Sequence, residues 1–466
     1  MTRGLLAALA LGLCAGCAVG PDYKKPESVV TPMYGEAGPW KVAVPKDTLP
    51  RGEWWKVFQD PTLDELEGKV AAANPTLRAA LARVDQAAAV ARINRAQLLP
   101  SLHLDFAPDR LRYSGNREEP PGTFASPYTT NSIDLPLALS YEVDLFGRVR
   151  RTYESARALA RASAADYQNV LLSLQALVAE DYFSLRSLLA QDAILAHTVD
   201  LRSQALKLVR QRRIGGASDD LDVYQAEADY DGVLSDQAAI DRQVAEARHG
   251  LAILVGELPA NFSFDPPPLG GVPPAIPTGL PSELLERRPD VATAEQTLAS
   301  ANAQIGVAKA AFFPEIDLTA YAGVNSAAFN TLLNTSSREW AVAPFVSLPL
   351  FQGGANLANY HRSEAAYDEA VANYRQQVLV AFQDVENGLS DLRFLTQQAA
   401  ALDEAVDAAT KAADLSVIRY KEGVADYFEV IDAERTALSD QLLAAGLQGQ
   451  RFISTVLLVK ALGGGW

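Results

Sequence analysis

The sequence predicts an α+β membrane protein in which four strands and several very long helices form an internal two-fold repeat. Three observations carry this prediction: two long stretches without proline, four stretches of alternating apolar and polar residues, and a repeat that includes both. The chain has 466 residues, of which 48% are hydrophobic and 21% charged. Helices of the predicted length are not typical of a compact enzyme, whose helices average about 10–14 residues.

The first residues are interpreted as a targeting segment. Arg3 precedes an apolar run that is shorter than the about 20 residues needed to cross a bilayer. The run ends in LCAGC, which resembles the lipobox of bacterial lipoproteins, although Cys14 departs from the usual pattern. Cleavage would remove residues 1–16 and leave a lipidated Cys17; a plain signal peptide is the alternative. Ala18, where an aspartate would favour inner-membrane retention, favours the outer membrane.

Long helices are indicated by the absence of proline between Leu137 and Leu258 and after Pro349. Proline costs about 3 kcal/mol inside a helix, and the Ala-, Leu-, Gln-, Glu- and Arg-rich composition of both stretches favours helix. At about 1.5 Å rise per residue, each helical region could extend roughly 100 Å. An ordinary coiled coil is the alternative, but no sustained heptad seam is present.

The two halves of the chain align at a period of about 207 to 214 residues. The segment that starts at Asn74 aligns with the segment that starts at Arg288, and Gly216 falls on Gly423. A proline-rich stretch joins the halves and is interpreted as a linker. The predicted divisions are the signal peptide at 1–16, an N-terminal segment at 17–60, a first repeat at 61–257, the linker at 258–281 and a second repeat at 282–466.

Four strands are predicted, at about 101–113, 132–144, 314–325 and 339–350, with long helices continuing to 255 and 461. In the second strand Ile133, Leu135 and Leu137 occupy one face, and polar or small residues occupy most of the other. Such alternation of apolar and polar residues over about 9–11 residues fits a strand of a membrane β-barrel. A half-buried soluble sheet is the alternative. Because open strand edges cannot lie in hydrocarbon, four strands must be shared between protomers, and a trimer would supply twelve.

Composition excludes several functions. With 41 basic and 57 acidic residues the formal charge is −16, which argues against nucleic acid as a partner. The four histidines lie far apart and both cysteines precede the predicted mature core, so no metal site, disulfide or cofactor is expected. No nucleophile, base and orienting residue are grouped, so no catalytic residue is assigned. Asp219, Asp220 and Asp222 are interpreted as a solvated turn, and Trp54 and Trp55 as packing residues rather than a ligand site.

A family resemblance is carried by six segments that occur in this order along the chain: CAVGPDYKKP from Cys17, WWKVFQDPTLDEL from Trp54, ANPTLRAALARVDQA from Ala73, DLFG from Asp144, PLFQGG from Pro349 and RYKEGVADYFEVIDAER from Arg419. Together they resemble the outer membrane factor family, the TolC-like lipoprotein channels that serve tripartite efflux pumps of Gram-negative bacteria. The resemblance covers essentially the whole predicted mature chain.

The resemblance implies a homotrimer that forms a twelve-stranded β-barrel in the outer membrane, continued into the periplasm by a twelve-helix α-barrel. An equatorial belt would be built from the N-terminal segment, the linker and the C-terminal tail, and the loops 114–131 and 325–338 would face outside the cell. The implied partners are a periplasmic adaptor (membrane fusion) protein, an inner-membrane pump of the resistance-nodulation-division type, and outer membrane lipid.

Site residues are expected where the long helices reverse direction. The turns at 213–219 and 421–426 are expected to dock the adaptor, because Gly215 or Gly216 and Gly423 permit a tight reversal. These are the only docking positions that the sequence suggests.

A gate is expected on the helix after the second turn. Glu429 and Asp432 are three residues apart and share one helix face. The resemblance implies that they ring a closed periplasmic aperture with Phe428 as an apolar constriction, while Arg419 and Tyr420 tether one helix to its neighbour. Surface acids without a role are the alternative.

The expected function is a passive exit duct that takes its energy from an inner-membrane pump through the adaptor. A lipid-anchored periplasmic spacer without a pore, the exit channel of a type I protein secretion system, and a secreted or periplasmic enzyme are the alternatives.

Overall fold

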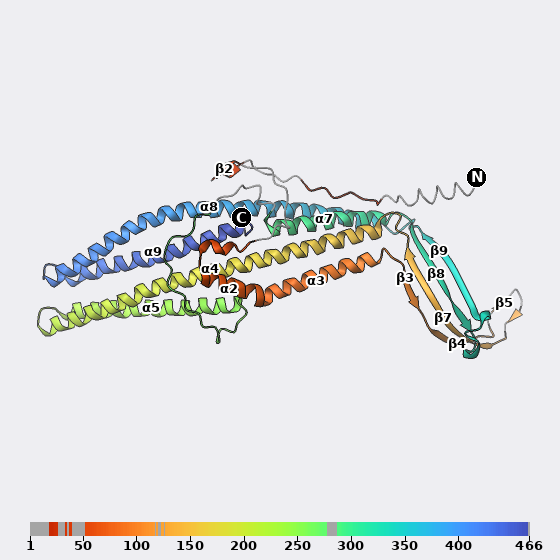
Figure 1. The fold of residues 1–466 in the computed structure, drawn as a ribbon, viewed down its shortest axis with the longest axis horizontal. Helices are drawn as coiled ribbons and strands as arrows, with labels where there is room; N and C mark the ends of the chain where they lie inside the picture. The colour runs from red at the N-terminus through yellow and green to blue at the C-terminus, as the bar shows by residue number, and fades with distance from the viewer. Residues whose placement is uncertain are drawn as a thin grey trace. The chain divides into compact units, whose positions relative to one another are not determined.

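The computed structural model describes residues 18–26, 52–116, 126–276 and 287–464, together with strand pieces at 33–34, 37–39, 118–119 and 123–124. The chain forms two compact units, and each takes residues from both sequence repeats (Figure 1). The strand unit comprises Met1–Glu27, Val84–Ser163 and Ala294–Tyr374, and the core unit comprises Ser28–Arg83, Ala164–Thr293 and Arg375–Trp466. Cys17 lies outside the described residues.

The helices and strands follow the order of the sequence repeat. In the first half they are η1 (Trp54–Phe58), α2 (Pro61–Ala73), α3 (Pro75–Ala96), β3 (Ser101–Leu104), β4 (Ala107–Tyr113), β7 (Tyr128–Glu142), α4 (Arg148–Ile214) and α5 (Asp220–Leu254). In the second half they are α7 (Pro289–Ala310), β8 (Glu315–Ser326), η3 (Phe329–Thr331), η4 (Thr335–Ser337), β9 (Arg338–Ser347), α8 (Ala355–Lys421) and α9 (Tyr427–Ala461). Short pieces form β1 (Met33–Tyr34), β2 (Ala37–Pro39), β5 (Glu118–Glu119) and β6 (Thr123–Phe124).

The two halves of the chain contain helices of the same lengths in the same order. The helices α4 and α8 each have 67 residues, α5 and α9 each have 35, and α3 and α7 each have 22. Figure 1 shows α4 and α8 as the two longest ribbons. One described helix, α9, is long and apolar enough by length and composition to cross a membrane, and 44% of its apolar window is buried within the chain.

The strand unit contains an antiparallel sheet in the order β3–β7–β8–β9, with β4 also paired to β7. The first predicted strand is thus broken in two, and the break lies opposite Pro136 of β7, which has no N–H to donate to the ladder. At the break the Asp105 N–H donates to the Pro136 carbonyl oxygen at 3.0 Å. On the other side of β7, a Cβ on Gly323 would lie 2.6 Å from Pro136 Cα, so the close approach of β8 requires glycine there.

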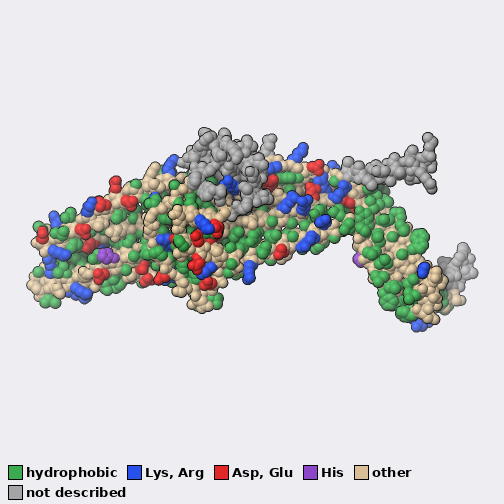
Figure 2. Space-filling view, in the orientation of Figure 1, with side chains coloured by type: hydrophobic (Ala, Val, Ile, Leu, Met, Phe, Trp, Pro, Cys, Tyr) green, Lys and Arg blue, Asp and Glu red, His purple; other side chains and the backbone are tan. Residues whose placement is uncertain are grey.

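The sheet has two free edges among the described strands. The strands β3 and β4 pair only with β7, and β9 pairs only with β8. Side chains of β3, β4 and β9 are largely exposed, and hydrophobic side chains cover much of the strand surface seen in Figure 2. An exposed apolar sheet with open edges must be covered by another surface to be stable in the cell.

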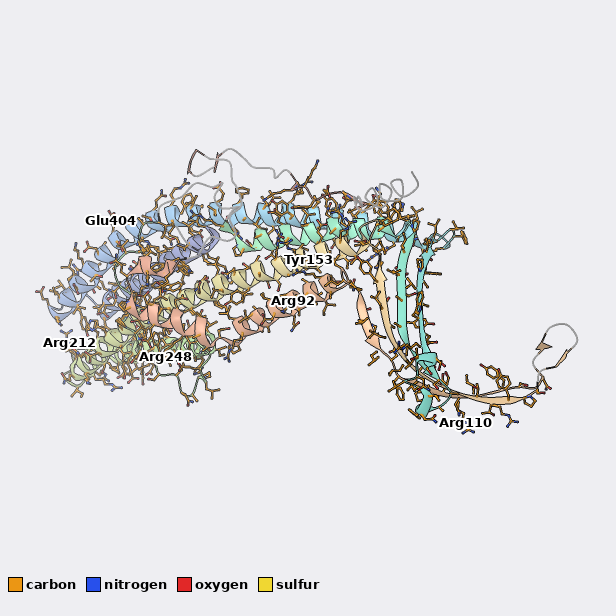
Figure 3. The ribbon with its side chains drawn as sticks, turned by 45° about the vertical axis from the view of Figure 1, so that its right-hand side comes forward. Arg92, Arg110, Tyr153, Arg212, Arg248 and Glu404 are labelled. Atoms are coloured by element: carbon orange, nitrogen blue, oxygen red, sulfur yellow. The ribbon has the colours of Figure 1, made fainter. Side chains whose placement is uncertain are left out.

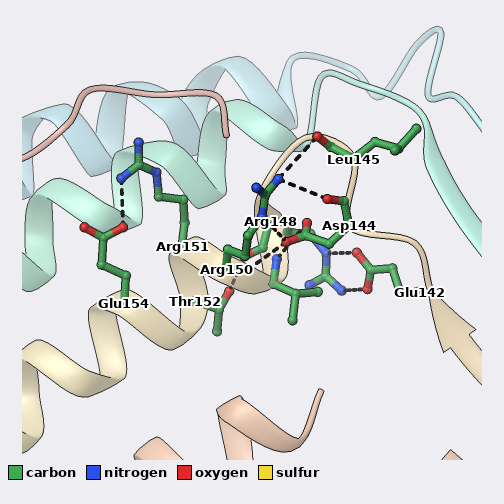
Figure 4. Close-up of polar contacts among 9 residues, drawn as sticks. Glu142, Asp144, Leu145, Arg148, Arg150, Arg151, Thr152 and Glu154 are labelled. Carbon is green, nitrogen blue, oxygen red and sulfur yellow. Dashed lines mark hydrogen bonds and ion pairs between the residues drawn. The ribbon is translucent and has the colours of Figure 1, made fainter. Parts of the chain in front are cut away.

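The joint between β7 and α4 is held by the acidic residues of the EVDLFG segment (Figure 4). The Asp144 carboxylate accepts from the backbone N–H groups of Val149 at 3.2 Å and Arg150 at 2.9 Å, which caps the start of α4. The Arg148 guanidinium donates to Glu142 through Nε at 2.9 Å. Figure 4 shows both carboxylates turned toward the first turn of α4. The strand and the helix are therefore joined rigidly.

The segment after Cys17 is docked within the strand unit. The Val19 N–H donates to the Phe146 carbonyl at 3.0 Å, and Asp22 forms an ion pair of 2.7 Å with the buried Arg151. A Cβ added to Gly20, whose φ is +101°, would lie 2.5 Å from Gly306 Cα. Glycine is thus required where this segment crosses α7.

The core unit is organised around aromatic side chains. Trp54 and Trp55 are buried at 4% and 7% exposure in a cluster with Tyr182, Phe183 and Phe452. The rings of Phe183 and Phe452 lie 4.8 Å apart between centroids, which brings α4 against α9. Both tryptophans pack in this core, and neither indole N–H has a hydrogen-bond partner among the described residues.

An unusual acid lies in the same core. Glu67 of α2 is 0% exposed, and neither carboxylate oxygen has a hydrogen-bond partner among the described residues. Burial, with a smaller contribution from the charge of Asp64, raises the pKa of Glu67 to about 9. Glu67 is therefore protonated at neutral pH.

Candidate functional site

The two helix reversals of the core unit have the same construction. After α4 the Ala217 N–H donates to the Arg212 carbonyl at 2.8 Å, and after α8 the Val424 N–H donates to the Arg419 carbonyl at 3.0 Å. Gly216 and Gly423 occupy the left-handed region, with φ of +74° and +78°. Gly215 does not have a positive φ, so Gly216 is the residue that permits the first reversal.

Each reversal ends in an aspartate that caps the next helix. The Asp219 carboxylate accepts from the Asp222 N–H, and the Asp426 carboxylate accepts from the Glu429 N–H, both at 3.0 Å. Asp220 forms an ion pair of 2.7 Å with Arg213 across the first turn. The aspartates of the first turn therefore cap and brace a solvated reversal, as expected from the sequence.

The expected gate residues lie on the first turns of α9. Phe428 is 61% exposed and Asp432 is also exposed, whereas the neighbouring Tyr427, Val430 and Ile431 are buried. The Glu429 carboxylate is half-buried and accepts from Arg419 Nε at 2.9 Å. Phe428, Glu429 and Asp432 thus lie on the side of α9 that this chain leaves uncovered.

Arg419 and Tyr420 both contact α9, and Tyr420 also contacts α4. Arg419 links α8 to α9 through Glu429. Tyr420 is 7% exposed, and the Arg212 guanidinium of α4 lies 4.4 Å from its ring centroid while donating to its carbonyl oxygen at 3.2 Å. Figure 3 labels Arg212 near the end of α4. Tyr420 also packs against Tyr427, 5.3 Å away between centroids, in an apolar cluster with Val209 and Ile431.

Farther along these helices lies a buried charge cluster that sequence reasoning missed. Arg202 of α4 and Asp229 of α5 are 2% and 4% exposed, and Arg202 Nε lies 2.7 Å from Asp229 Oδ2. Arg202 also contacts Glu434 of α9, and Arg435 Nε of α9 lies 2.8 Å from Asp229 Oδ1. The cluster therefore joins α4, α5 and α9.

The cluster affects its surroundings electrostatically. Burial lowers the pKa of Arg202 from its ordinary value, opposed by the charge of Asp229, and the guanidinium stays charged. Burial also raises the pKa of the Tyr427 hydroxyl to about 12, although the positive charge of Arg202 opposes the rise. Tyr427 is therefore neutral and serves as a packing residue beside the cluster.

The Arg202–Asp229 pair has no counterpart in the second half of the repeat. Because α4 and α8 are equal in length, Arg202 aligns with Ala409, and Asp229 of α5 aligns with Thr436 of α9. No group of three His, Cys, Asp or Glu side chains suited to a metal ion occurs within the described ranges.

Paired helices of this length, joined to an open-edged sheet with exposed apolar residues, define a membrane channel component. The family model described as "Outer membrane efflux protein" matches residues 67–257 and 280–464. The chain belongs to this outer membrane efflux protein family.

Curated relatives agree with this assignment. The chain is 33% identical to outer membrane protein OprJ of Pseudomonas aeruginosa over 474 aligned positions, covering 99% of the chain and 95% of OprJ. It is 34% identical to the solvent efflux pump outer membrane protein SrpC of Pseudomonas putida, covering 98% and 97%. The expected role in efflux and location in the outer membrane are thereby confirmed.

Solved structures show the same fold. The outer-membrane channel OprN matches with a TM-score of 0.88 and 31% identity, covering 97% of this chain and 100% of that one. The outer membrane channel MtrE of Neisseria gonorrhoeae, solved in an open state, matches with a TM-score of 0.81 and 31% identity, covering 96% and 98%. The fold class expected from the sequence, that of the TolC-like channels, is confirmed.

Proposed function

We propose that three copies of the chain form a passive duct for small molecules, gated at the helix reversals and supplied by an inner-membrane pump through a periplasmic adaptor. The observation that carries this proposal is the sheet with two free edges, since four strands cannot close a barrel alone. No catalytic step is assigned to the chain. A spacer without a pore would leave the exposed apolar sheet unexplained. No structural observation favours the exit channel of a protein secretion system.

The gate is proposed at the side of α9 that carries Phe428, Glu429 and Asp432. Around a three-fold axis each copy would contribute two carboxylates to one ring, and a phenyl ring beside them would narrow the aperture. The Arg419–Glu429 ion pair would hold α9 against α8 in the closed arrangement. Because both side chains are about half exposed, this pair is easily released, as a gate requires.

Replacing both acids in a Glu429→Ala/Asp432→Ala variant is expected to increase the resting single-channel conductance and weaken block by divalent cations. The variant removes the carboxylate ring and the partner of Arg419 together. Conductance in planar bilayers, with and without a divalent cation, measures both effects. A matched control is Asp403→Ala/Glu404→Ala, which removes two exposed acids of α8 away from the turn. Equal conductance and block in the two variants would place the gate elsewhere, and wild-type protein without conductance would favour a spacer.

The two reversals are proposed to dock the adaptor, with Gly216 and Gly423 setting their shape. A Gly216→Val/Gly423→Val variant is expected to lose co-purification with the adaptor, because valine disfavours a positive φ. Gly215→Ala is the matched control, since Gly215 has an ordinary φ. Unchanged adaptor binding in the double variant would remove the turns from the docking surface.

Cys17 is proposed to carry lipid. The support is the lipobox-like LCAGC sequence, in which cleavage would make Cys17 the first residue of the mature chain, and the docked segment that follows Cys17. An intact mass of the purified protein that matched an unmodified N-terminus at residue 17 would refute lipidation.

A further inference from the structure

Five exposed basic residues lie near the helix ends of the strand unit that meet the sheet, although the whole chain has a formal charge of −16. We call them the basic collar: Arg92, Arg95, Arg157, Lys309 and Arg362. All five are exposed, and no ion pair to any of them is found among the described residues. Figure 2 shows Lys and Arg side chains on the helices beside the strands, and Figure 3 labels Arg92 near the end of α3.

The collar comes from all four helices that adjoin the sheet. Arg92 and Arg95 lie in the last turns of α3, which ends at Ala96 just before β3, and Lys309 is the penultimate residue of α7. Arg362 lies two turns into α8, and Arg157 lies within the first three turns of α4. At about 1.5 Å rise per residue, each cation lies within roughly 15 Å of the helix end that meets the strands.

Apolar residues occupy the level between the collar and the strands. Leu99, between α3 and β3, is 70% exposed, and Leu102, at the start of β3, is 61% exposed. Leu350 and Phe351, which follow β9, are each 89% exposed. Long cationic side chains next to an apolar rim can place their aliphatic portions in the hydrocarbon of the membrane. Their charged groups then lie among the lipid headgroups. The headgroup region adds about 5–8 Å on each side of the hydrocarbon, within reach of Arg and Lys side chains.

We propose that the basic collar binds the phosphate groups of anionic phospholipids in the periplasmic leaflet of the outer membrane. This proposal rests on the proposed placement of the sheet in that membrane. Each arginine or lysine near an anionic surface adds favourable electrostatic attraction, so several together bind lipid without a closed pocket. The collar thereby fixes the height of the protein in the membrane, at the rim where β7 is rigidly joined to α4.

The test compares lipid-dependent stability of the full-length protein in detergent. Phosphatidylglycerol and phosphatidylcholine are added separately, and the unfolding midpoint is followed by circular dichroism. We expect phosphatidylglycerol to raise the midpoint more than phosphatidylcholine does, and the difference to shrink in high salt. The variant Arg92→Gln/Lys309→Gln/Arg362→Gln should lose at least about half of that difference. The matched control Lys69→Gln/Arg242→Gln/Lys411→Gln removes three exposed cations of the core unit and should retain it.

Three outcomes overturn the proposal. The first is an equal phosphatidylglycerol effect in the collar variant and the wild type, and the second is the same stabilisation by inorganic phosphate alone. The third is a collar variant that loses as much stability in phosphatidylcholine as in phosphatidylglycerol, which would assign these cations to contacts between copies. A different result would show that the sheet is not placed in the membrane at all: the wild-type protein would then not enter vesicles of either lipid.

Discussion

Asp229→Ala is expected to lower the free energy of unfolding by about 3 kcal/mol, because it leaves the buried Arg202 without its buried counter-charge. The Asp229 carboxylate lies 2.7 Å from Arg202 Nε and 2.8 Å from Arg435 Nε, and both Arg202 and Asp229 are buried. Removal of one partner of a buried pair typically costs about 3–5 kcal/mol. Glu434 remains in contact with Arg202, which places the expected loss at the lower end.

The matched control is Glu246→Ala on the same helix. Glu246 forms an exposed i,i+4 pair with Arg242, and such a pair contributes only about 0.3–0.5 kcal/mol. Chemical unfolding of both variants in detergent, followed by circular dichroism, gives the comparison. Equal midpoints for Asp229→Ala and Glu246→Ala would contradict the assigned role of the cluster.

A second variant separates the charge from the packing. Arg202→Met/Asp229→Leu replaces both buried ions by apolar side chains of similar length, a change that is often neutral or stabilising. It should recover most of the stability lost in Asp229→Ala, since Arg435 is 61% exposed and Glu434 is partly exposed, so both can turn to water. A double variant as unstable as Asp229→Ala would contradict the unpaired charge of Arg202 as the cause of the loss.

Features that depend on local sequence were predictable. The absence of proline and the internal repeat predict two pairs of long helices, and the alternation predicts strands in both halves. The reversals were also predictable, because Gly216 and Gly423 are followed three residues later by aspartates that cap α5 and α9. Even the break in the first strand had a signal, in the form of Pro136 within a strand that pairs on both sides.

Features that depend on distant pairing were not predictable. Arg202 and Glu434 are 232 residues apart in sequence, and nothing local indicates that they meet. Glu67 lies in the segment DELEGKV, whose polar composition suggests a solvated helix, yet Leu63, Leu66 and Val70 direct its face into the core. The collar escaped notice because its members come from four helices far apart in sequence, within a chain that is acidic overall.

Glu67 gives the second large expected effect, a loss of stability with rising pH that Glu67→Gln should abolish. In the unfolded chain this carboxyl releases its proton near pH 4.5, whereas burial raises its pKa in the folded protein to about 9. Between these values the folded state holds a proton that the unfolded state has released, so the free energy of unfolding falls as pH rises. The slope is about 1.4 kcal/mol per pH unit at 25 °C.

The variant should therefore match the wild type at about pH 5 and exceed its stability increasingly above that, by roughly 3–4 kcal/mol at pH 8. Glutamine reproduces the shape and polarity of the protonated acid and cannot ionise. Glu65→Gln is the matched control, because Glu65 lies on the exposed face of the same helix, where it pairs with Lys69 at 3.1 Å. Unfolding midpoints for the three proteins between pH 5 and pH 8 provide the measurement.

The role of Glu67 is judged from how the stability difference between Glu67→Gln and the wild type changes with pH, because other groups also titrate between pH 5 and pH 8. Their contributions are shared by the wild type and Glu67→Gln, so they cancel in the difference between the two curves. A difference that grows with pH identifies Glu67 as the group that is kept protonated by burial. Parallel curves would instead mean that water or a counter-charge reaches this carboxylate in the assembled channel, and that the core around Trp54 and Trp55 is open to solvent.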